Sequence, residues 1–240
     1  MRRFALTSLA LVAAAVAVAQ DAPKQSSIEG SLTFVTGNSE SESVFLFGQT
    51  KRAMAGGRFN AYFAYNFGKQ SFGGPKRTTT NNLGFGARFE KDFGIKSFWY
   101  ASADWFRDDI NGLDLRSNYG LGLGYTVKDE EVWGWRVSAG LSFVDEDYVV
   151  GRDRSFTGLE LGSQYRRNLS SKLSLTHDFR YIPNTDDFED YVFTSNLGLA
   201  YAISSDFNVG LRYIIVHDET PAAGFLKETR TLRLTIGVKF

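Results

Sequence analysis

Charged side chains recur at alternate positions along many segments of this 240-residue chain. In segment 114–127, large apolar residues occupy one parity and polar residues or glycine occupy the other, which is the period-2 pattern of a β-strand. Residues of equal parity share one face of a sheet, so the charges are expected to collect on one side. The charges expected on that inner face are Arg58, Arg88, Arg116, Arg136, Arg166, Arg180, Arg212, Arg233, Glu90, Asp104, Asp114, Glu160 and Asp178.

Such a set of charges allows two functional interpretations if the sheet closes into a barrel. Charges that line a water-filled lumen select ions by sign, and the excess of arginine here favours anions weakly. Arginine–carboxylate pairs can instead fill the lumen, because buried charges are tolerated when they are paired. The sequence therefore leaves open a narrow passive channel and a structural barrel whose lumen is plugged by ion pairs.

One group of residues points to a third interpretation, a lipid-active enzyme. His177 is expected on the outward, apolar face of its strand, with Ser163 and Ser195 on the neighbouring strands. A serine activated by a histidine is the nucleophile of many acyl-cleaving enzymes. However, no Asn, Asp or Glu is expected on the outward face near His177 to orient its ring. The chain is accordingly predicted not to be an enzyme.

The composition excludes several other classes of protein. The absence of Cys removes disulfides, thiolate metal sites and cysteine nucleophiles. The 27 basic and 27 acidic residues balance, whereas a nucleic-acid-binding protein normally has a basic excess. The acidic residues expected in loops lack the ordered spacing of a calcium-binding loop. We therefore expect no nucleic-acid partner, no metal and no cofactor.

The N-terminal residues 1–19 are predicted to be a signal peptide. Arg2 and Arg3 precede an apolar stretch, and Ala17–Ala19 fits the small-x-small rule for cleavage. The apolar stretch is shorter than a membrane-spanning helix requires. Residues 20–240 then form a single domain.

Alternation continues from residue 26 to the end, and no helical pattern follows the signal peptide. Links after even-numbered strands are short, and those after odd-numbered strands are mostly longer and often acidic. This arrangement predicts a closed antiparallel transmembrane β-barrel of about 12 strands. The strands are expected near 26–36, 42–53, 58–68, 78–90, 95–107, 114–127, 133–144, 156–167, 172–182, 191–203, 207–217 and 229–240.

The apolar faces are expected to meet lipid, because Gly- and Asn-rich polar faces suit a crowded lumen. Aromatic residues near the strand ends are predicted to form two girdles at the membrane surfaces. We expect a location in the cell outer membrane, with its lipid as a partner. One girdle contains Phe59, Phe89, Tyr125, Trp135, Tyr165, Tyr201, Phe207 and Phe240, and the other contains Phe67, Trp105 and Tyr181.

The alternating last strand ends in Phe240, which resembles the signal that the barrel-assembly machinery reads during biogenesis. Val238 stands where an aromatic residue is usual in that signal, so the match is partial. The machinery is expected to be a transient partner, and the sequence does not indicate an oligomeric state.

The chain resembles the DUF481 family, described as salt-induced outer-membrane proteins, over residues 28–240. The resemblance implies a porin-like barrel in the outer membrane and a link to salt or osmotic conditions. It implies no established chemistry, so these residues mark the fold rather than a site. The residues that carry it are Gly30–Leu32, Thr36–Ser39, Asp104, Asp108, Gly112–Arg116 and Gly120–Tyr125.

Overall fold

A computed structural model describes residues 25–35, 40–71 and 74–240 of the chain. The predicted signal peptide and residues 20–24 lie outside this part. All twelve predicted strands are present, with small differences at their ends. The strands are β1 (Gln25–Val35), β2 (Glu40–Met54), β3 (Gly57–Ser71), β4 (Arg77–Asp92), β5 (Ser97–Asp108), β6 (Leu113–Asp129), β7 (Trp133–Tyr148), β8 (Arg154–Asn168), β9 (Leu173–Pro183), β10 (Tyr191–Ala202), β11 (Phe207–Asp218) and β12 (Glu228–Lys239).

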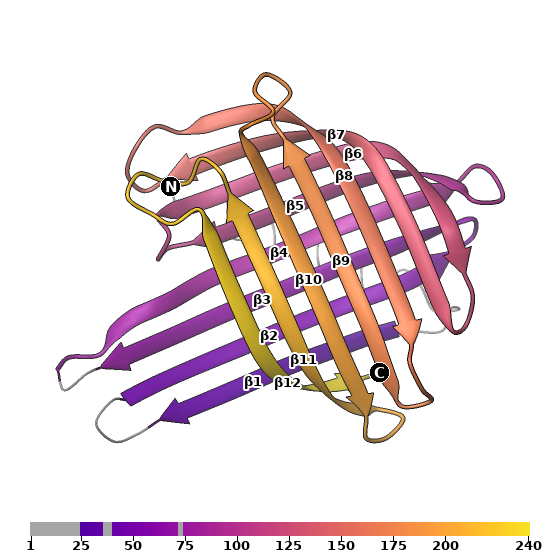
Figure 1. Cartoon of the computed structure of the whole chain (residues 1–240), viewed down its shortest axis with the longest axis horizontal. Helices are drawn as coiled ribbons and strands as arrows, with labels where there is room; N and C mark the ends of the chain where they lie inside the picture. The colour runs from indigo at the N-terminus through magenta and orange to yellow at the C-terminus, as the bar shows by residue number, and fades with distance from the viewer. Residues whose placement is uncertain (1–24, 36–39, 72–73) are drawn as a thin grey trace.

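The strands form one closed antiparallel barrel in which each strand pairs with its neighbours in sequence, and β1 pairs with β12 (Figure 1). Closure removes the free strand edges that an open sheet would expose. We call the end with the short turns after β2, β4, β6, β8 and β10 the turn end, and the opposite end the loop end. Within the described segments, no helix is long and apolar enough to cross a membrane.

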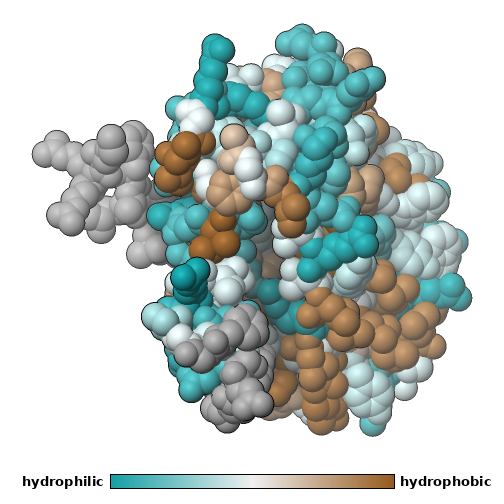
Figure 2. Space-filling view, turned by 60° about the vertical axis from the view of Figure 1, so that its left-hand side comes forward, coloured by the Kyte–Doolittle hydropathy of each residue, from teal (hydrophilic) through white to brown (hydrophobic). Residues whose placement is uncertain are grey.

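The outward face of the barrel is largely apolar. Leu121, Leu123 and Leu141 are each about 60 % exposed, and Leu234 is 70 % exposed. Figure 2 shows hydrophobic residues gathered at the lower right of its view and hydrophilic residues gathered at the top. An apolar surface of this extent does not face water in a soluble monomer.

The lumen is tightly packed on the side formed by β4 to β8. Phe98 and Tyr100 on β5 are fully buried there, at 1 % and 0 % exposure. They fit because β6 presents glycines opposite them. A Cβ atom on Gly124 would lie 2.1 Å from the Phe98 ring, and one on Gly122 would lie 2.7 Å from the Tyr100 ring. The Gly-x-Gly repeat of β6 therefore makes room for two aromatic rings.

These inward aromatic rings differ from the expectation that aromatics gather in two outer girdles. Besides Phe98 and Tyr100, the rings of Phe45, Phe47 and Tyr62 also lie in the lumen, where each contacts a lumen arginine or carboxylate. The period-2 pattern identifies the two faces of each strand. It does not prevent a large ring from occupying the inner face when glycines opposite leave space.

Candidate functional site

The centre of the packed side holds two buried carboxylates shared by three arginines. Glu90 pairs with Arg88 at 2.9 Å and also with Arg136. Glu160 lies 3.5 Å from Arg88 and 3.3 Å from Arg180. Both carboxylates are 1 % exposed, so the pairing compensates for the cost of burying them.

Aromatic rings and a third carboxylate hold these arginines in place. The guanidinium of Arg88 lies 3.5 Å from the centre of the Tyr100 ring, and that of Arg136 lies 4.0 Å from the centre of the Phe98 ring. Cations are attracted to the faces of such rings. Arg180 also binds Asp104 at 2.8 Å, and Asp104 accepts a hydrogen bond from the hydroxyl of Tyr62 at 3.0 Å.

A second charge cluster closes the loop end of the packed side. Glu146 is fully buried and pairs with both Arg116 and Arg154, the latter at 2.6 Å. Arg116 also pairs with Asp218 on β11. Glu146 lies beyond the predicted strand 133–144, so the sequence pattern did not assign it to the inner face. Strand β7 continues to Tyr148, and the alternation carries Glu146 into the lumen.

The loop Glu219–Lys227 between β11 and β12, which we name the crossing loop, reaches over the mouth at this end. In the closed strand order, β11 and β12 lie opposite β5 and β6. Ala222 of the crossing loop is 6 % exposed, and Phe225 lies against Gly112 of the β5–β6 connection. Gly112 has a φ of 68°, and a Cβ atom there would meet Phe225 at 2.7 Å. The loop therefore spans the mouth and partly covers it.

Asp190, in the connection before β10, anchors the crossing loop. It accepts a hydrogen bond from the hydroxyl of Thr220, and Arg154 donates to both of its oxygens at 2.9 Å. Burial alone would raise the pKa of Asp190. The hydrogen bond from Thr220 and the contacts of Arg154 and Asn184 outweigh burial and hold that pKa below its usual range.

The lumen is accessible at inward positions of β2 and β3 and of β8 and β9 across from them, and we call this space the open side. Asp178, Lys51 and Gln164 face inward by register and are exposed, and Tyr62 is 38 % exposed. Because these side chains face the lumen, the solvent that reaches them is inside the barrel. Lys51 and Asp178 influence each other electrostatically across this space. The lumen thus combines a packed side with an open side.

The remaining predicted lumen arginines differ in their pairing. Arg58 and Arg166 both approach Asp129 at the turn end, at 3.6 and 2.7 Å. Arg212 binds both oxygens of Glu29, with its Nε at 2.6 Å.

Arg233 is the exception among these arginines. It stacks on the Phe45 ring at 3.8 Å and has no carboxylate within 4.0 Å among the residues that the structure describes.

Asp114 does not join these charges, which corrects its assignment to the inner face. The pairing of β6 with β7 shifts register between Leu113 and Leu115, so Leu113 is buried and Asp114 is the extra residue of a bulge. Asp114 is exposed and influences Arg107 and Asp147 instead. A bulge adds one residue to a strand, so strict alternation along the sequence assigns residues on one side of the bulge to the wrong face.

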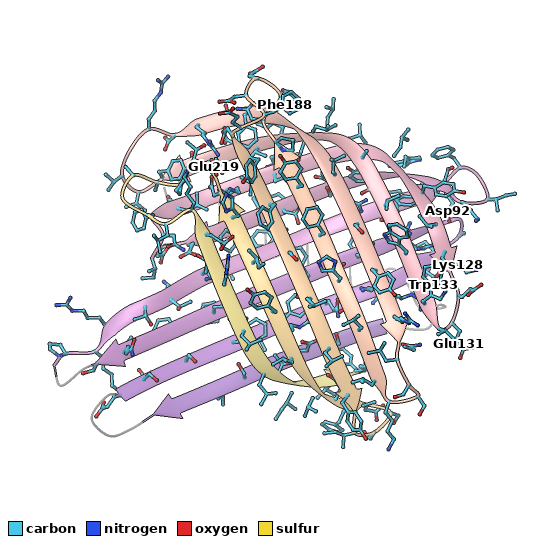
Figure 3. The ribbon with its side chains drawn as sticks, viewed as in Figure 1. Asp92, Lys128, Glu131, Trp133, Phe188 and Glu219 are labelled. Carbon is cyan, nitrogen blue, oxygen red and sulfur yellow. The ribbon has the colours of Figure 1, made fainter. Side chains whose placement is uncertain are left out.

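The residues proposed as girdles lie on outward positions, and several pair with other rings. Phe89 lies 5.4 Å from Trp99, Tyr165 lies 6.4 Å from Trp133, and Tyr181 lies 5.3 Å from Tyr191. In Figure 3, Asp92, Lys128, Glu131 and Trp133 lie at the turn end, and Phe188 and Glu219 lie at the loop end.

Other proposed girdle residues have different neighbours. Trp105 stacks on Phe85 at 5.0 Å, and Lys69 lies over the Phe67 ring at 5.2 Å. Phe59 is the register partner of Phe89. Tyr125, Trp135, Tyr201, Phe207 and Phe240 are exposed, at 38 to 63 %. Outward rings also occur between the ends, since Phe63 pairs in register with Phe85.

His177 lies on the outward face, with its Nε2 atom 2.9 Å from the hydroxyl of Ser195. Ser163 is not beside it, because the register places Tyr165 opposite His177, and Ser163 accepts a hydrogen bond from Trp135. In the described part of the chain, no acidic or amide side chain is hydrogen-bonded to His177. The pair therefore lacks the third group that orients the histidine in a catalytic triad.

The described residues contain no group of three or more His, Asp or Glu side chains that could hold a metal ion.

The family model of DUF481, described as a protein of unknown function, matches residues 28–240. No curated protein matches the chain in sequence. An outer membrane channel from Pseudomonas putida F1 superposes with a TM-score of 0.52 at 12 % identity, covering 93 % of this chain and 97 % of that one. The NanC porin superposes with a TM-score of 0.51 at 9 % identity, covering 90 % and 98 %. At these identities the likeness concerns the fold.

Proposed function

Because the chain belongs to the DUF481 family, over residues 28–240, and folds as a closed twelve-stranded barrel, we propose that it is a narrow passive channel of the cell outer membrane. The observation that carries this proposal is the open side of the lumen. Lys51, Asp178 and Tyr62 are accessible to water inside the barrel. The apolar outward face supports placement in a bilayer, since such a face is stable against lipid. Outer-membrane lipid and, during biogenesis, the assembly machinery are the proposed partners.

The packed side sets the width of the proposed channel. The arginines around Glu90 and Glu160 are each ion-paired, and Arg88 and Arg136 also lie on aromatic rings, so they do not swing aside to widen the passage. Solutes therefore use the open side and must pass the crossing loop at the mouth. This geometry suits small ions and small solutes rather than polymers.

A structural barrel without transport remains the second candidate, and the same charge clusters favour it. If the crossing loop and the outer charge cluster around Glu146 seal the mouth permanently, the open side is a closed water-filled cavity. We infer no enzyme activity, because His177 and Ser195 lack an orienting third residue. Unchanged lipase activity in a His177→Ala variant would remove that third candidate.

Conductance of the refolded chain in planar bilayers separates the first two candidates. We expect small, ohmic currents in KCl. Under a KCl gradient, we expect the reversal potential to shift when Lys51→Gln removes a cation from the open side. Lys96→Gln is the matched control, because Lys96 lies over the outward Tyr125 ring at 5.9 Å. Absence of current over a wide range of KCl concentration would establish the plugged barrel instead.

The link to salt or osmotic conditions is part of the same proposal and is supported by the family resemblance alone. We expect transcript and protein levels to rise when cells are shifted to high NaCl. They should not rise under an unrelated stress that slows growth to the same extent. Constant protein levels in both conditions would remove the link without affecting the channel proposal.

A further inference from the structure

Strand pairing in the barrel wall is incomplete at the boundary between β1 and β12, which we call the closing seam. Ser27–Gly30 pair with Ile236–Lys239, and Ser26 and Phe240 exchange two backbone hydrogen bonds. Beyond Gly30, the described residues show no pairing across the seam. Each strand nevertheless continues to pair on its other side, β1 with β2 as far as Val35 and β12 with β11 as far as Glu228. The seam is closed at the turn end and parted toward the loop end.

Figure 1 shows the same arrangement, with β1 and β12 together near their labels and diverging toward the left of the view. The strand pairing of the wall is therefore interrupted along this length, between the lumen and the outward face.

Arg233 lies on the lumen side of the parted length. It comes before Ile236, the β12 residue at which pairing with β1 stops. Its guanidinium reaches the ring of Phe45 on β2, and β1 lies between β12 and β2 in the barrel. The side chain therefore crosses the inner side of the seam.

The charge of Arg233 is not compensated by the described residues. Each of the other predicted lumen arginines has a carboxylate within 4.0 Å, whereas Arg233 has only the Phe45 ring. Its register partner on β11 is Arg212, a second cation, and Arg212 already binds Glu29. A partly buried cation beside another cation favours the binding of an anion. Among the described residues, Arg233 thus lacks an anionic partner.

The outward side of the same seam is apolar. Leu32 on β1 is 68 % exposed, and Leu232 and Leu234 on β12 are 67 % and 70 % exposed. The seam thus has a cation inside, leucines outside and no backbone pairing between them. A molecule with an anionic head and an apolar chain matches this order.

We propose that Arg233 binds the carboxylate head of an anionic amphiphile, a fatty acid, whose acyl chain lies in the parted length of the closing seam and extends into the bilayer. The seam then serves as a lateral route between lumen and lipid. This inference rests on the proposed placement in a bilayer, and it does not require ion conductance.

Photocrosslinking tests the site in the refolded full chain, reconstituted in lipid. The probe is a fatty acid that carries a diazirine near the end of its chain, and labelled peptides are located by mass spectrometry. We expect labelling of β1 and β12 to exceed labelling of the other strands, and to be displaced by laurate but not by lauryl alcohol. Labelling of the remaining outward face measures non-specific contact with lipid.

Substitutions at Arg233 give the decisive comparison. Arg233→Gln should lower seam labelling about ten-fold, the loss expected for a charge-assisted hydrogen bond. Arg233→Lys should retain part of the labelling, and Lys96→Gln should retain all of it. All variants are first checked for a barrel circular-dichroism spectrum and for the wild-type shift in gel mobility on heating.

Three results would overturn the proposal. They are uniform labelling around the barrel, equal labelling of wild type and Arg233→Gln, and displacement by acetate as effective as displacement by laurate. The last result would mean that Arg233 binds small carboxylates without using the seam. Conductance is measured separately, so failure of the channel proposal is distinguishable from failure of this one.

Discussion

Close packing, and not polarity alone, restricts which residue types fit at individual positions in the lumen. Gly124 faces Phe98 so closely that any side chain would overlap the ring, since three ring atoms lie 2.1 to 2.7 Å from the position of a Cβ atom. Gly48, on the outward face of β2, has nothing within 4 Å of the same position. Alanine substitutions at the two positions can therefore be compared to separate a packing requirement from the general effect of adding a methyl group.

Gly124→Ala is expected to destabilise the barrel by about 1–3 kcal/mol, because an overpacked interior forces rings and backbone to shift. Thermal and urea unfolding of the refolded protein, followed by tryptophan fluorescence, measures the change. Gly48→Ala is the control and should leave the unfolding midpoint unchanged. Combining Gly124→Ala with Phe98→Leu should recover part of the lost stability, and equal midpoints for the two single variants would refute this account.

At the scale of elements, the crossing loop is the feature that decides access to the lumen. It belongs to the connection between β11 and β12, yet it contacts Tyr148 of β7 and the connections before β6 and β10. The hydroxyl oxygen of Tyr148 lies 3.4 Å from the backbone oxygen of Thr220, in addition to the Asp190–Thr220 contact. Loss of these few polar contacts would free the loop without disturbing the strands.

Acid is expected to release the crossing loop. The pKa of Asp190 is held below its usual range when the loop is docked. The stabilisation from its ionised form is therefore complete above the ordinary Asp pKa of about 4 and disappears as the pH falls through the lower, docked pKa. A spin label on Ala223→Cys, in a chain without other cysteines, should be immobile at pH 7 and become progressively more mobile as the pH falls from about 4 toward the lower, docked pKa.

Asp190→Asn should give the mobile spectrum at every pH, because the amide cannot carry the charge that Arg154 binds. Asp186→Asn, an exposed residue of the same connection, should behave like the parent protein. Unchanged mobility of the label in the parent protein as the pH falls through the docked pKa of Asp190, or a mobile label in both variants, would show that Asp190 does not hold the loop.

At the scale of the whole molecule, the two faces of the wall have opposite character. The outward face carries all four tryptophans, Trp99, Trp105, Trp133 and Trp135, and the inward face carries the paired charges. This is the inverse of a soluble β-barrel, whose apolar residues fill the interior.

The tryptophans give a test of the proposed membrane placement. In bilayers that contain lipids brominated on their acyl chains, fluorescence of the refolded chain should be strongly quenched. Aqueous iodide should quench it weakly, since the rings face away from water. Strong quenching by iodide together with no effect of the brominated lipids would contradict a transmembrane barrel.

The sequence by itself determined the number of strands, their order and the inward parity of most lumen charges. These follow from the period-2 alternation and the turn positions, which are local properties of the chain. It also determined that Gly120, Gly122 and Gly124 share the inner face, because their spacing alone fixes this. The pattern did not give the correct face for Asp114, because it lies in a bulge. It did not place Glu146 in the lumen, because strand β7 is longer than its apolar run.

The tertiary structure decided which charges meet, since ion pairs such as Arg116–Asp218 and Arg212–Glu29 join residues from distant parts of the sequence. It also decided that Arg233 has no carboxylate partner among the described residues, that the crossing loop spans the mouth and that the closing seam parts beyond Gly30. Each depends on how the wall curves and closes, which sets the distances across the lumen. Alternation specifies a face for every side chain, but only closure specifies its neighbour.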